Sequence, residues 1–287
     1  MRSPLTTIDA LGFIATRRQL LDRGHTGGQL TAAVRRDQIR RVRRGWYASP
    51  LATHDQTEAV RIGGRLSHSS AARHYGLWSG SDRRLHVSVT RGASRLRQRN
   101  GAAVHWVAPG RVDVSSPSTW CVSLEDCLRG MVRCAPREDA IACLDSAIER
   151  YRMSPRRIRS IFADEPARSR LIARSSRPGS ESGLESITRQ RIEALGVQVQ
   201  QQVTIAGVGR VDMVLEGWLV VELDGFEYHS DPAAFERDRA RMAALVRLDR
   251  LGLQFTYRQV MHDWPTVEQT ILHALALVPS VAIQEEV

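Results

Sequence analysis

Short blocks of regularly spaced apolar residues open the chain and predict a compact arrangement of helices and strands in residues 1–50. Thr16–Gly24 has helical spacing and closes on a glycine, which is a common helix stop. Gln29–Arg36 predicts a second helix, and Ile39–Ala48 predicts a strand or hairpin. The first segment is therefore expected to run helix, turn, helix and then a basic strand.

A second segment, residues 51–163, mixes helical and alternating patterns. Ser67–Leu77 lies in a helical stretch, whereas Leu85–Thr90 and Ala103–Val107 alternate as strands do. Leu124–Tyr151 predicts one or two helices. These patterns indicate a middle α/β domain, and they assign no chemistry to it.

The third segment begins after residues 164–183, whose Arg, Ser, Pro and Gly content is typical of a linker. Leu184–Leu195 then predicts a helix, and Val197–Ile205 alternates as a strand. Gly209–Leu215 and Trp218–Asp224 predict a β-hairpin. Together the three segments predict an α+β protein of 287 residues, with the third as a separate domain, residues 184–287.

The distribution of charge separates the two ends of the chain. All 41 basic residues are arginine. Residues 1–100 have a net charge of +13, whereas residues 181–287 have a net charge of −7. A basic front and an acidic back indicate that one part holds a polyanion and the other gathers carboxylates.

The basic front suits DNA. Its predicted order of elements is that of a winged helix-turn-helix, in which the second helix enters the major groove and the wing lies along phosphates. A protein-interaction module with solvated arginines is the alternative. The expected phosphate-binding residues, whose contacts are independent of base sequence, are Arg35, Arg36, Arg40, Arg41, Arg43 and Arg44.

The predicted hairpin of the third segment holds three carboxylates. A two-residue turn would pair Asp212 with Val221, whereas a three-residue turn at Glu216–Trp218 would pair Asp212 with Glu222. The apolar pattern favours the longer turn, because it puts six apolar residues on one face. These are Val211, Met213, Leu215, Leu219, Val221 and Leu223.

On the other face, Asp212, Glu222 and Asp224 would repel one another unless a cation lay between them. A hard divalent ion with oxygen ligands, Mg²⁺ or Mn²⁺, satisfies that need. The alternative is that these acids face solvent at the end of the sheet. Their position among apolar residues favours the metal site.

Two resemblances extend these expectations. The stretches GFIATRRQLLDRG and IRRVRRGWYA resemble the N-terminal domain of AbiEi-type antitoxins, and the middle segment resembles longer AbiEi-like proteins more loosely. The third segment resembles the very short patch repair-like (Vsr-like) branch of PD-(D/E)xK endonucleases, of the actinobacterial domain-of-unknown-function type. The matching text is SGLES, QVTIAGVGRVDMVL, VVELDGFEYHSD, FERDRARM and LGLQFTYRQVMHDWP.

The second resemblance implies a restriction-endonuclease-like core, a mixed sheet flanked by helices, and roles for individual residues. Asp212 and Glu222 would bind the metal with the Leu223 carbonyl as a third oxygen, and Glu185 would position the metal-bound water. Asp224 stands where the superfamily has its motif lysine, and the chain contains no lysine. His229 would replace the lysine as general base or proton shuttle.

Two further arginines are assigned to DNA. Arg241 matches the D-x-x-R of the resembled family, where it would form a helix-surface ion pair with Asp238 or contact phosphate. Arg258, expected at the end of a strand, would face phosphate.

Other features narrow the class of protein. The sequence has no apolar run of the roughly 20 residues that a membrane span needs and no signal-peptide block, so we expect a cytoplasmic protein with no membrane partner. Four cysteines are expected to be buried thiols rather than disulfides or zinc ligands: Cys121, Cys127, Cys134 and Cys143. Four histidines have no metal-ligand spacing and are expected to be ordinary polar or core residues: His68, His74, His86 and His105.

The sequence therefore predicts a Mg²⁺-dependent endodeoxyribonuclease that a basic winged helix delivers to double-stranded DNA. Its target stays open among mismatches, modified bases, foreign DNA and RNA. The alternative is an antitoxin-like DNA-binding regulator, with a toxin–antitoxin or defence partner, whose nuclease-type domain is catalytically silent.

Overall fold

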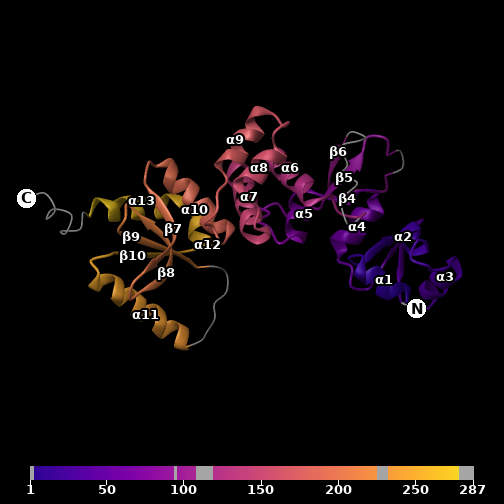
Figure 1. The fold of residues 1–287 in the computed structure, drawn as a ribbon, viewed down its shortest axis with the longest axis horizontal. Helices are drawn as coiled ribbons and strands as arrows, with labels where there is room; N and C mark the ends of the chain where they lie inside the picture. Colours follow the sequence, from indigo (N-terminus) through magenta and orange to yellow (C-terminus); the bar gives the residue numbers. More distant parts are fainter. Residues whose placement is uncertain (1–2, 94–95, 108–118, 225–231, 278–287) are drawn as a thin grey trace, which may run out of the picture. The chain divides into compact units, whose positions relative to one another are not determined.

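A computed structural model of the chain describes residues 3–93, 96–107, 119–224 and 232–277, the backbone alone for 232–238. These residues form thirteen helices and three sheets, which confirms the α+β class (Figure 1). The chain divides into two compact units. Unit 1 comprises Met1–Cys143 and Arg159–Ala173, and unit 2 comprises Leu144–Ile158 and Arg174–Val287.

Unit 1 begins with three short helices and a small antiparallel sheet of strand order β1-β3-β2. Thr16 and Thr26 start the second and third helices with capping boxes to Gln19 and Gln29, which satisfy free N–H groups of the first turns. The elements, in chain order, are α1 (Pro4–Ala10), β1 (Ile14–Thr16), α2 (Arg17–Leu21), α3 (Gly27–Arg35), β2 (Arg40–Arg43) and β3 (Trp46–Ala48).

The two expected helices and the basic hairpin of this region are therefore present; α2 is shorter than expected, and α3 begins two residues earlier and ends one residue earlier. One apolar core ties them together, and its buried members are Ile8, Ala15, Leu20, Leu30, Ala33 and Ile39. This core fixes α3 against the β2–β3 hairpin within unit 1.

The rest of unit 1 contains a second three-stranded sheet, of order β4-β5-β6, in which β5 and β6 run parallel. The expected strands and the two-helix alternative for 124–151 are confirmed. The elements are α4 (His54–Ile62), β4 (Arg65–Leu66), α5 (His68–His74), β5 (His86–Thr90), β6 (Ala103–Val107) and α6 (Leu124–Cys134).

The expected linker, residues 164–183, is wrong for its central part. After α7 (Arg137–Tyr151) and α8 (Pro155–Ile161), the helix α9 spans Ala167–Ser175. Its arginines and serines resemble linker composition, but Ile172 and Ala173 are buried and hold the helix in place.

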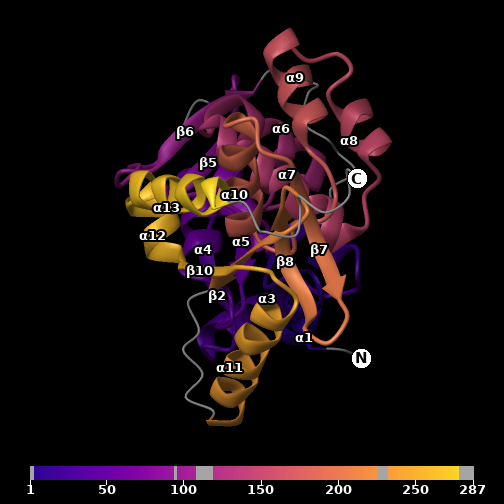
Figure 2. The same cartoon turned by 90° about the vertical axis from the view of Figure 1, so that its left-hand side faces the viewer.

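Unit 2 is built on a four-stranded sheet of order β10-β9-β8-β7, antiparallel except for the parallel pair β9–β10. Figures 1 and 2 show α11 on one side of this sheet and α10, α12 and α13 on the other. The elements are α10 (Gly183–Ala194), β7 (Val199–Ile205), β8 (Gly209–Leu215), β9 (Leu219–Asp224), α11 (Pro232–Arg247), β10 (Gly252–Thr256), α12 (Tyr257–His262) and α13 (Trp264–Ala276).

A buried carboxylate anchors α10 to α7 within unit 2. Asp145 is fully buried and accepts hydrogen bonds from Ser186 Oγ at 2.6 Å and Arg189 Nη2 at 2.9 Å. The Arg177 N–H donates to its other oxygen at 2.9 Å. Because Ser186 and Arg189 both lie on α10, this network fixes the helix that carries Glu185.

Two further expectations, on membrane spans and on the cysteines, can be compared with the structure. Among the described residues, no helix has the length and apolar character that a membrane crossing requires. Three of the cysteines are buried free thiols as expected, but Cys134 is exposed.

Candidate functional site

The β8–β9 hairpin brings two of the expected ligands together. Its register pairs Met213 with Val221 and Leu215 with Leu219, which leaves a three-residue turn and confirms the longer of the two predicted turns. Continued one step, this pairing sets Asp212 opposite Glu222. The Asp212 N–H donates to Glu222 Oε2 at 3.3 Å, so the two residues lie side by side on one face.

Main-chain and helix contacts hold this pair from both sides. The Leu223 N–H donates to Asp212 Oδ2 at 2.9 Å. Arg241, on α11, contacts Glu222 Oε1 through Nη2 and donates from the same nitrogen to the Arg210 carbonyl at 2.8 Å. Arg241, expected at phosphate, therefore also belongs to the carboxylate site as the cation beside Glu222.

Glu185 reaches the same region from the first turn of α10. Ser182 caps this helix by accepting from the Glu185 N–H at 3.1 Å. The Glu185 side chain is buried, and its Oε2 accepts from the Glu181 N–H and from Gln202 Nε2, both at 2.9 Å. The negative charge of Asp212 repels that of Glu185, and this repulsion adds to the rise in the pKa of Glu185.

Gln202, which the sequence analysis did not single out, lies between Glu185 and Asp212. Its backbone φ is 51°, the left-handed region, which is rare for a non-glycine residue within a strand. Its amide donates to Glu185, and a hydrogen bond from it lowers the pKa of Asp212. Its Oε1 is buried and has no hydrogen-bond partner among the described residues.

The surroundings disfavour three negative charges. Burial raises the pKa of Glu185, of Asp212 and of Glu222 above their ordinary values. The charge of Asp212 raises the pKa of Glu222 further, whereas Arg241 lowers it. A second cation at this site would favour the ionised carboxylates.

Two more of the predicted residues line a hollow of about 100 Å³ beside the pair. Leu223 and Asp224 line it, but Asp224 is exposed at the strand end and accepts from Gln254 Nε2 at 2.9 Å. Asp224 is thus turned toward β10 rather than into the Asp212–Glu222 contact. His229 lies outside the described residues.

Arg258 was expected at the end of a strand, and that expectation is wrong. The strand β10 ends at Thr256, whose side chain caps α12, and Arg258 is an exposed residue in the first turn of that helix. Arg258 does not line the hollow.

The six arginines that the sequence assigned to phosphate divide into two groups by their exposure. Five are exposed on α3 and the β2–β3 hairpin, namely Arg35, Arg36, Arg40, Arg41 and Arg44. Arg43 is half-buried, donates to the Val60 carbonyl at 3.4 Å and lies against Gly63 of the neighbouring α4 end. One nitrogen of its guanidinium is therefore used inside unit 1, and its assignment to phosphate stays a prediction.

Among the described residues, Asp212, Glu222 and Glu185 do not bring three ligand atoms close enough together to form a metal-binding cluster. Within the described part of the chain, the only three side chains of metal-binding type whose ligand atoms all lie within 4.8 Å of one another are His68, His86 and His105. Scans against protein-family models and curated proteins found no match for this chain. The nuclease and antitoxin resemblances therefore stay interpretations of sequence.

Proposed function

We propose that unit 2 is a divalent-metal-dependent DNA endonuclease domain. The observation that carries this proposal is the Asp212–Glu222 pair, opposed on one sheet face at the edge of a hollow. Burial raises the pKa values of both half-buried carboxylates even with Arg241 beside Glu222, so their ionised forms cost stability that a metal ion would offset. Such a cost is typical of functional sites.

The donor set fits Mg²⁺ or Mn²⁺. Asp212 and Glu222 would hold the ion, with the Leu223 carbonyl as a third oxygen, because hard cations prefer carboxylate and carbonyl oxygens. The Oε1 of Gln202, which has no hydrogen-bond partner in the part of the chain that the structure describes, is a further oxygen buried beside the carboxylates. When bound, the ion would lower the pKa of a water and neutralise the scissile phosphate.

The chain's own residues would orient the reactants. Gln202 donates to the Glu185 carboxylate at 2.9 Å, and Glu185 would accept a proton from an attacking water near Asp212. Arg241 would keep Glu222 ionised and present a positive charge to phosphate. His229 remains the proposed shuttle in place of the missing lysine.

Unit 1 would supply the DNA contact. Its first 50 residues run helix, strand, helix, helix and then hairpin, which is the order of a winged helix. Four exposed arginines flank the region where α3 meets the hairpin: Arg35, Arg36, Arg40 and Arg41. These would contact phosphate and leave base reading to α3.

One observation favours the second candidate, an antitoxin-like regulator with a silent nuclease fold. Arg241 already neutralises Glu222, so the described pair has a counter-ion without a metal. In that case the same domain would bind a partner without cleaving DNA.

Plasmid nicking separates the two candidates. Supercoiled DNA incubated with the protein and Mg²⁺ or Mn²⁺, with EDTA as the control, should be nicked, and Asp212→Asn should abolish nicking. Asp22→Asn, which changes an exposed acid in unit 1, should nick at the wild-type rate. His229→Ala should keep metal binding and slow nicking by roughly 10²–10⁴-fold, the usual cost of a lost general acid–base group.

Wild-type protein that neither binds Mn²⁺ by calorimetry nor nicks any DNA tested would support the silent regulator. A His229→Ala variant that nicks at the wild-type rate would remove His229 from the mechanism and leave the carboxylate proposal in place.

A further inference from the structure

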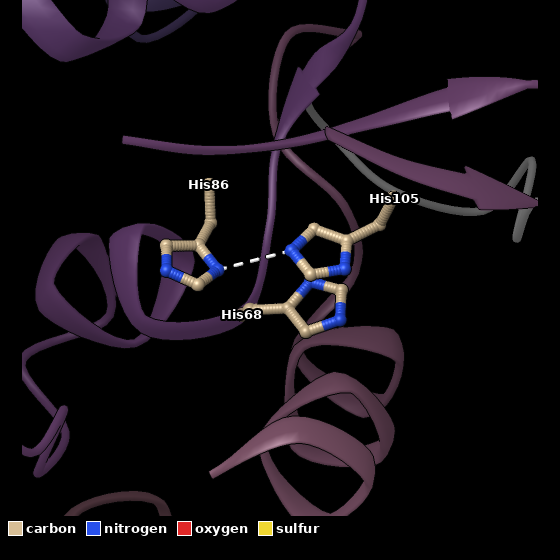
Figure 3. A group of neighbouring side chains, drawn as sticks. All are labelled: His68, His86 and His105. Atoms are coloured by element: carbon tan, nitrogen blue, oxygen red, sulfur yellow. Dashed lines mark hydrogen bonds between the residues drawn. The ribbon is translucent and has the colours of Figure 1, made fainter. Parts of the chain in front are cut away.

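Three histidines from separate elements of unit 1 meet at one point (Figure 3). His86 begins β5, His105 lies on the parallel strand β6, and His68 begins α5. The β5–β6 register pairs Ser88 with His105, and residues two apart share a face, so His86 and His105 project to the same side.

The ring contacts are close. His86 Nδ1 lies 3.0 Å from His105 Nε2, and the rings of His68 and His105 stack with centroids 3.5 Å apart. Two imidazole nitrogens on one Zn²⁺ lie roughly 3.3 Å apart, because each Zn–N bond is about 2.0–2.1 Å. The separation of the first pair is already close to that value.

Asp82 contacts one ring nitrogen of His86 and leaves the other nitrogen facing His105. Its Oδ2 lies 3.1 Å from His86 Nε2, and the Arg84 side chain keeps the pKa of Asp82 well below its ordinary range. A carboxylate accepts hydrogen bonds, so a neutral His86 would carry its proton on Nε2 and would present the Nδ1 lone pair to His105. This carboxylate–imidazole contact is the usual outer support of a metal-binding histidine.

His105 can present a second lone pair. With Nδ1 of His86 acting as acceptor, one proton on His105 Nε2 fills the space between the two rings. On the other side, His105 Nδ1 lies 4.0 Å from Cys134 Sγ. If the proton of His105 moved from Nε2 to Nδ1, His86 Nδ1 and His105 Nε2 would both have free lone pairs. A cation could then bind between these two nitrogens in place of the proton.

His68 is held in place at some cost. Its φ is 49°, a left-handed conformation that is strained for a residue with a side chain. A Cβ on Gly130 of α6 would lie 3.0 Å from its ring, so a larger residue there would require the ring to move by a few tenths of an ångström. Its Nδ1 is buried and has no hydrogen-bond partner among the described residues.

Two of the three rings, those of His68 and His105, are neutral at physiological pH. Burial and the neighbouring imidazoles lower the pKa of His68 to about 3, and burial with His86 lowers that of His105 to about 4. Neutral imidazole is the form that binds transition metals.

From this geometry we propose that His68, His86 and His105 form a binding site for a transition-metal ion of the Zn²⁺ type. Three imidazoles without a carboxylate ligand select Zn²⁺-like ions over Mg²⁺. The ring of His68, now stacked on His105, would tilt to aim a nitrogen at the ion. Three ligands leave a fourth position for water, and His68 lines a cavity of about 610 Å³ within unit 1.

The test uses the full chain without a histidine tag, stripped with chelator and titrated with Zn²⁺ by calorimetry and with Co²⁺ by visible absorption. Wild-type protein should bind one equivalent, with the intense absorption of tetrahedral Co²⁺. His86→Ala and His105→Ala should lose both signals. His74→Ala is the matched control, since His74 is an exposed histidine at the end of α5, the helix that His68 begins, and its ring packs against Trp120.

Asp82→Asn keeps the three ligands and should weaken binding by roughly 10–100-fold, as loss of an outer-shell partner does. This variant keeps the test decisive even if a histidine substitution unfolds the protein, which circular dichroism would reveal. Asp212→Asn should retain the Zn²⁺ signal, which separates this site from the carboxylates of unit 2. Octahedral Co²⁺ absorption, or equal binding by wild type, His105→Ala and Asp82→Asn, would overturn the proposal.

Discussion

Replacing Arg189 by methionine should destabilise unit 2 more than any surface substitution. The side chains of Arg189 and Asp145 are 3% and 1% exposed, and Nη2 lies 2.9 Å from Oδ2. Methionine keeps most of the volume of the side chain but removes its charge. Asp145 would then keep Ser186 and the Arg177 N–H as donors, with no counter-ion in contact.

The magnitude follows from the burial. At an effective dielectric constant of about 20, two unit charges 2.9 Å apart attract by roughly 6 kcal/mol, most of which offsets the cost of removing both from water. Removal of one partner of a buried pair typically costs about 3–5 kcal/mol. With an m-value of about 2 kcal/mol per M, the urea midpoint should fall by roughly 1.5–2.5 M.

The deficit should depend on pH. Burial raises the pKa of Asp145, so its protonated form is favoured in the folded state. A raised carboxyl pKa adds stability at low pH that is lost as pH rises through the folded pKa. The Arg189→Met variant should therefore approach wild-type stability as the pH is lowered, because a protonated Asp145 needs no counter-ion.

Urea unfolding followed by circular dichroism, with hydrogen exchange of α10 peptides, measures this effect. Arg18→Ala is the control, because its partner Asp22 is 3.8 Å away and both side chains are largely exposed, so its loss should cost less than about 1 kcal/mol. Asp145→Asn/Arg189→Met should recover part of the loss. An Arg189→Met variant within 1 kcal/mol of wild type at pH 7 would refute the anchoring role of this pair.

Two further predictions concern the carboxylates and the arginines. Asp212→Asn should raise the midpoint of thermal unfolding at pH 7 and bring no gain at pH 3, since the raised pKa of Asp212 makes its ionised form unfavourable; equal effects at both pH values would contradict this. Arg40→Ala/Arg41→Ala should lower the slope of log K against log salt for DNA binding by roughly one unit per lost phosphate contact. Arg43→Ala should leave that slope unchanged and lower stability instead; a changed slope would support the assignment of Arg43 to phosphate.

The sequence was sufficient for the hairpin register because only one register buries the apolar residues of both strands. Two neighbours of the site had no comparable signal. Gln202 depends on a left-handed backbone inside β7, and nothing in an alternating strand indicates such a residue. Arg241 reaches Glu222 only because α11 docks on that face through Ala244 and Leu245, which is a matter of tertiary packing.

The helix in the expected linker and the meeting of the three histidines have the same physical origin. The segment around α9 has the composition of a linker, and its helix is stabilised by burial of Ile172 rather than by local propensity. His68, His86 and His105 are 18 and 19 residues apart in sequence, so only the meeting of β5, β6 and α5 brings them together. Spacing rules for metal ligands describe single loops and helices, and they do not apply to such a site.

The register of the β8–β9 hairpin also bears on folding. A slip by one residue would turn Leu219 and Val221, both fully buried, toward the opposite face and would move Glu222 away from Asp212 at the same time. Because Val214 and Val220 are buried on that opposite face too, the slip would turn Glu222 into the apolar layer that Leu219 and Val221 now fill, and burial of this carboxylate would cost stability. Chains that reach the native packing therefore carry the carboxylate pair already assembled.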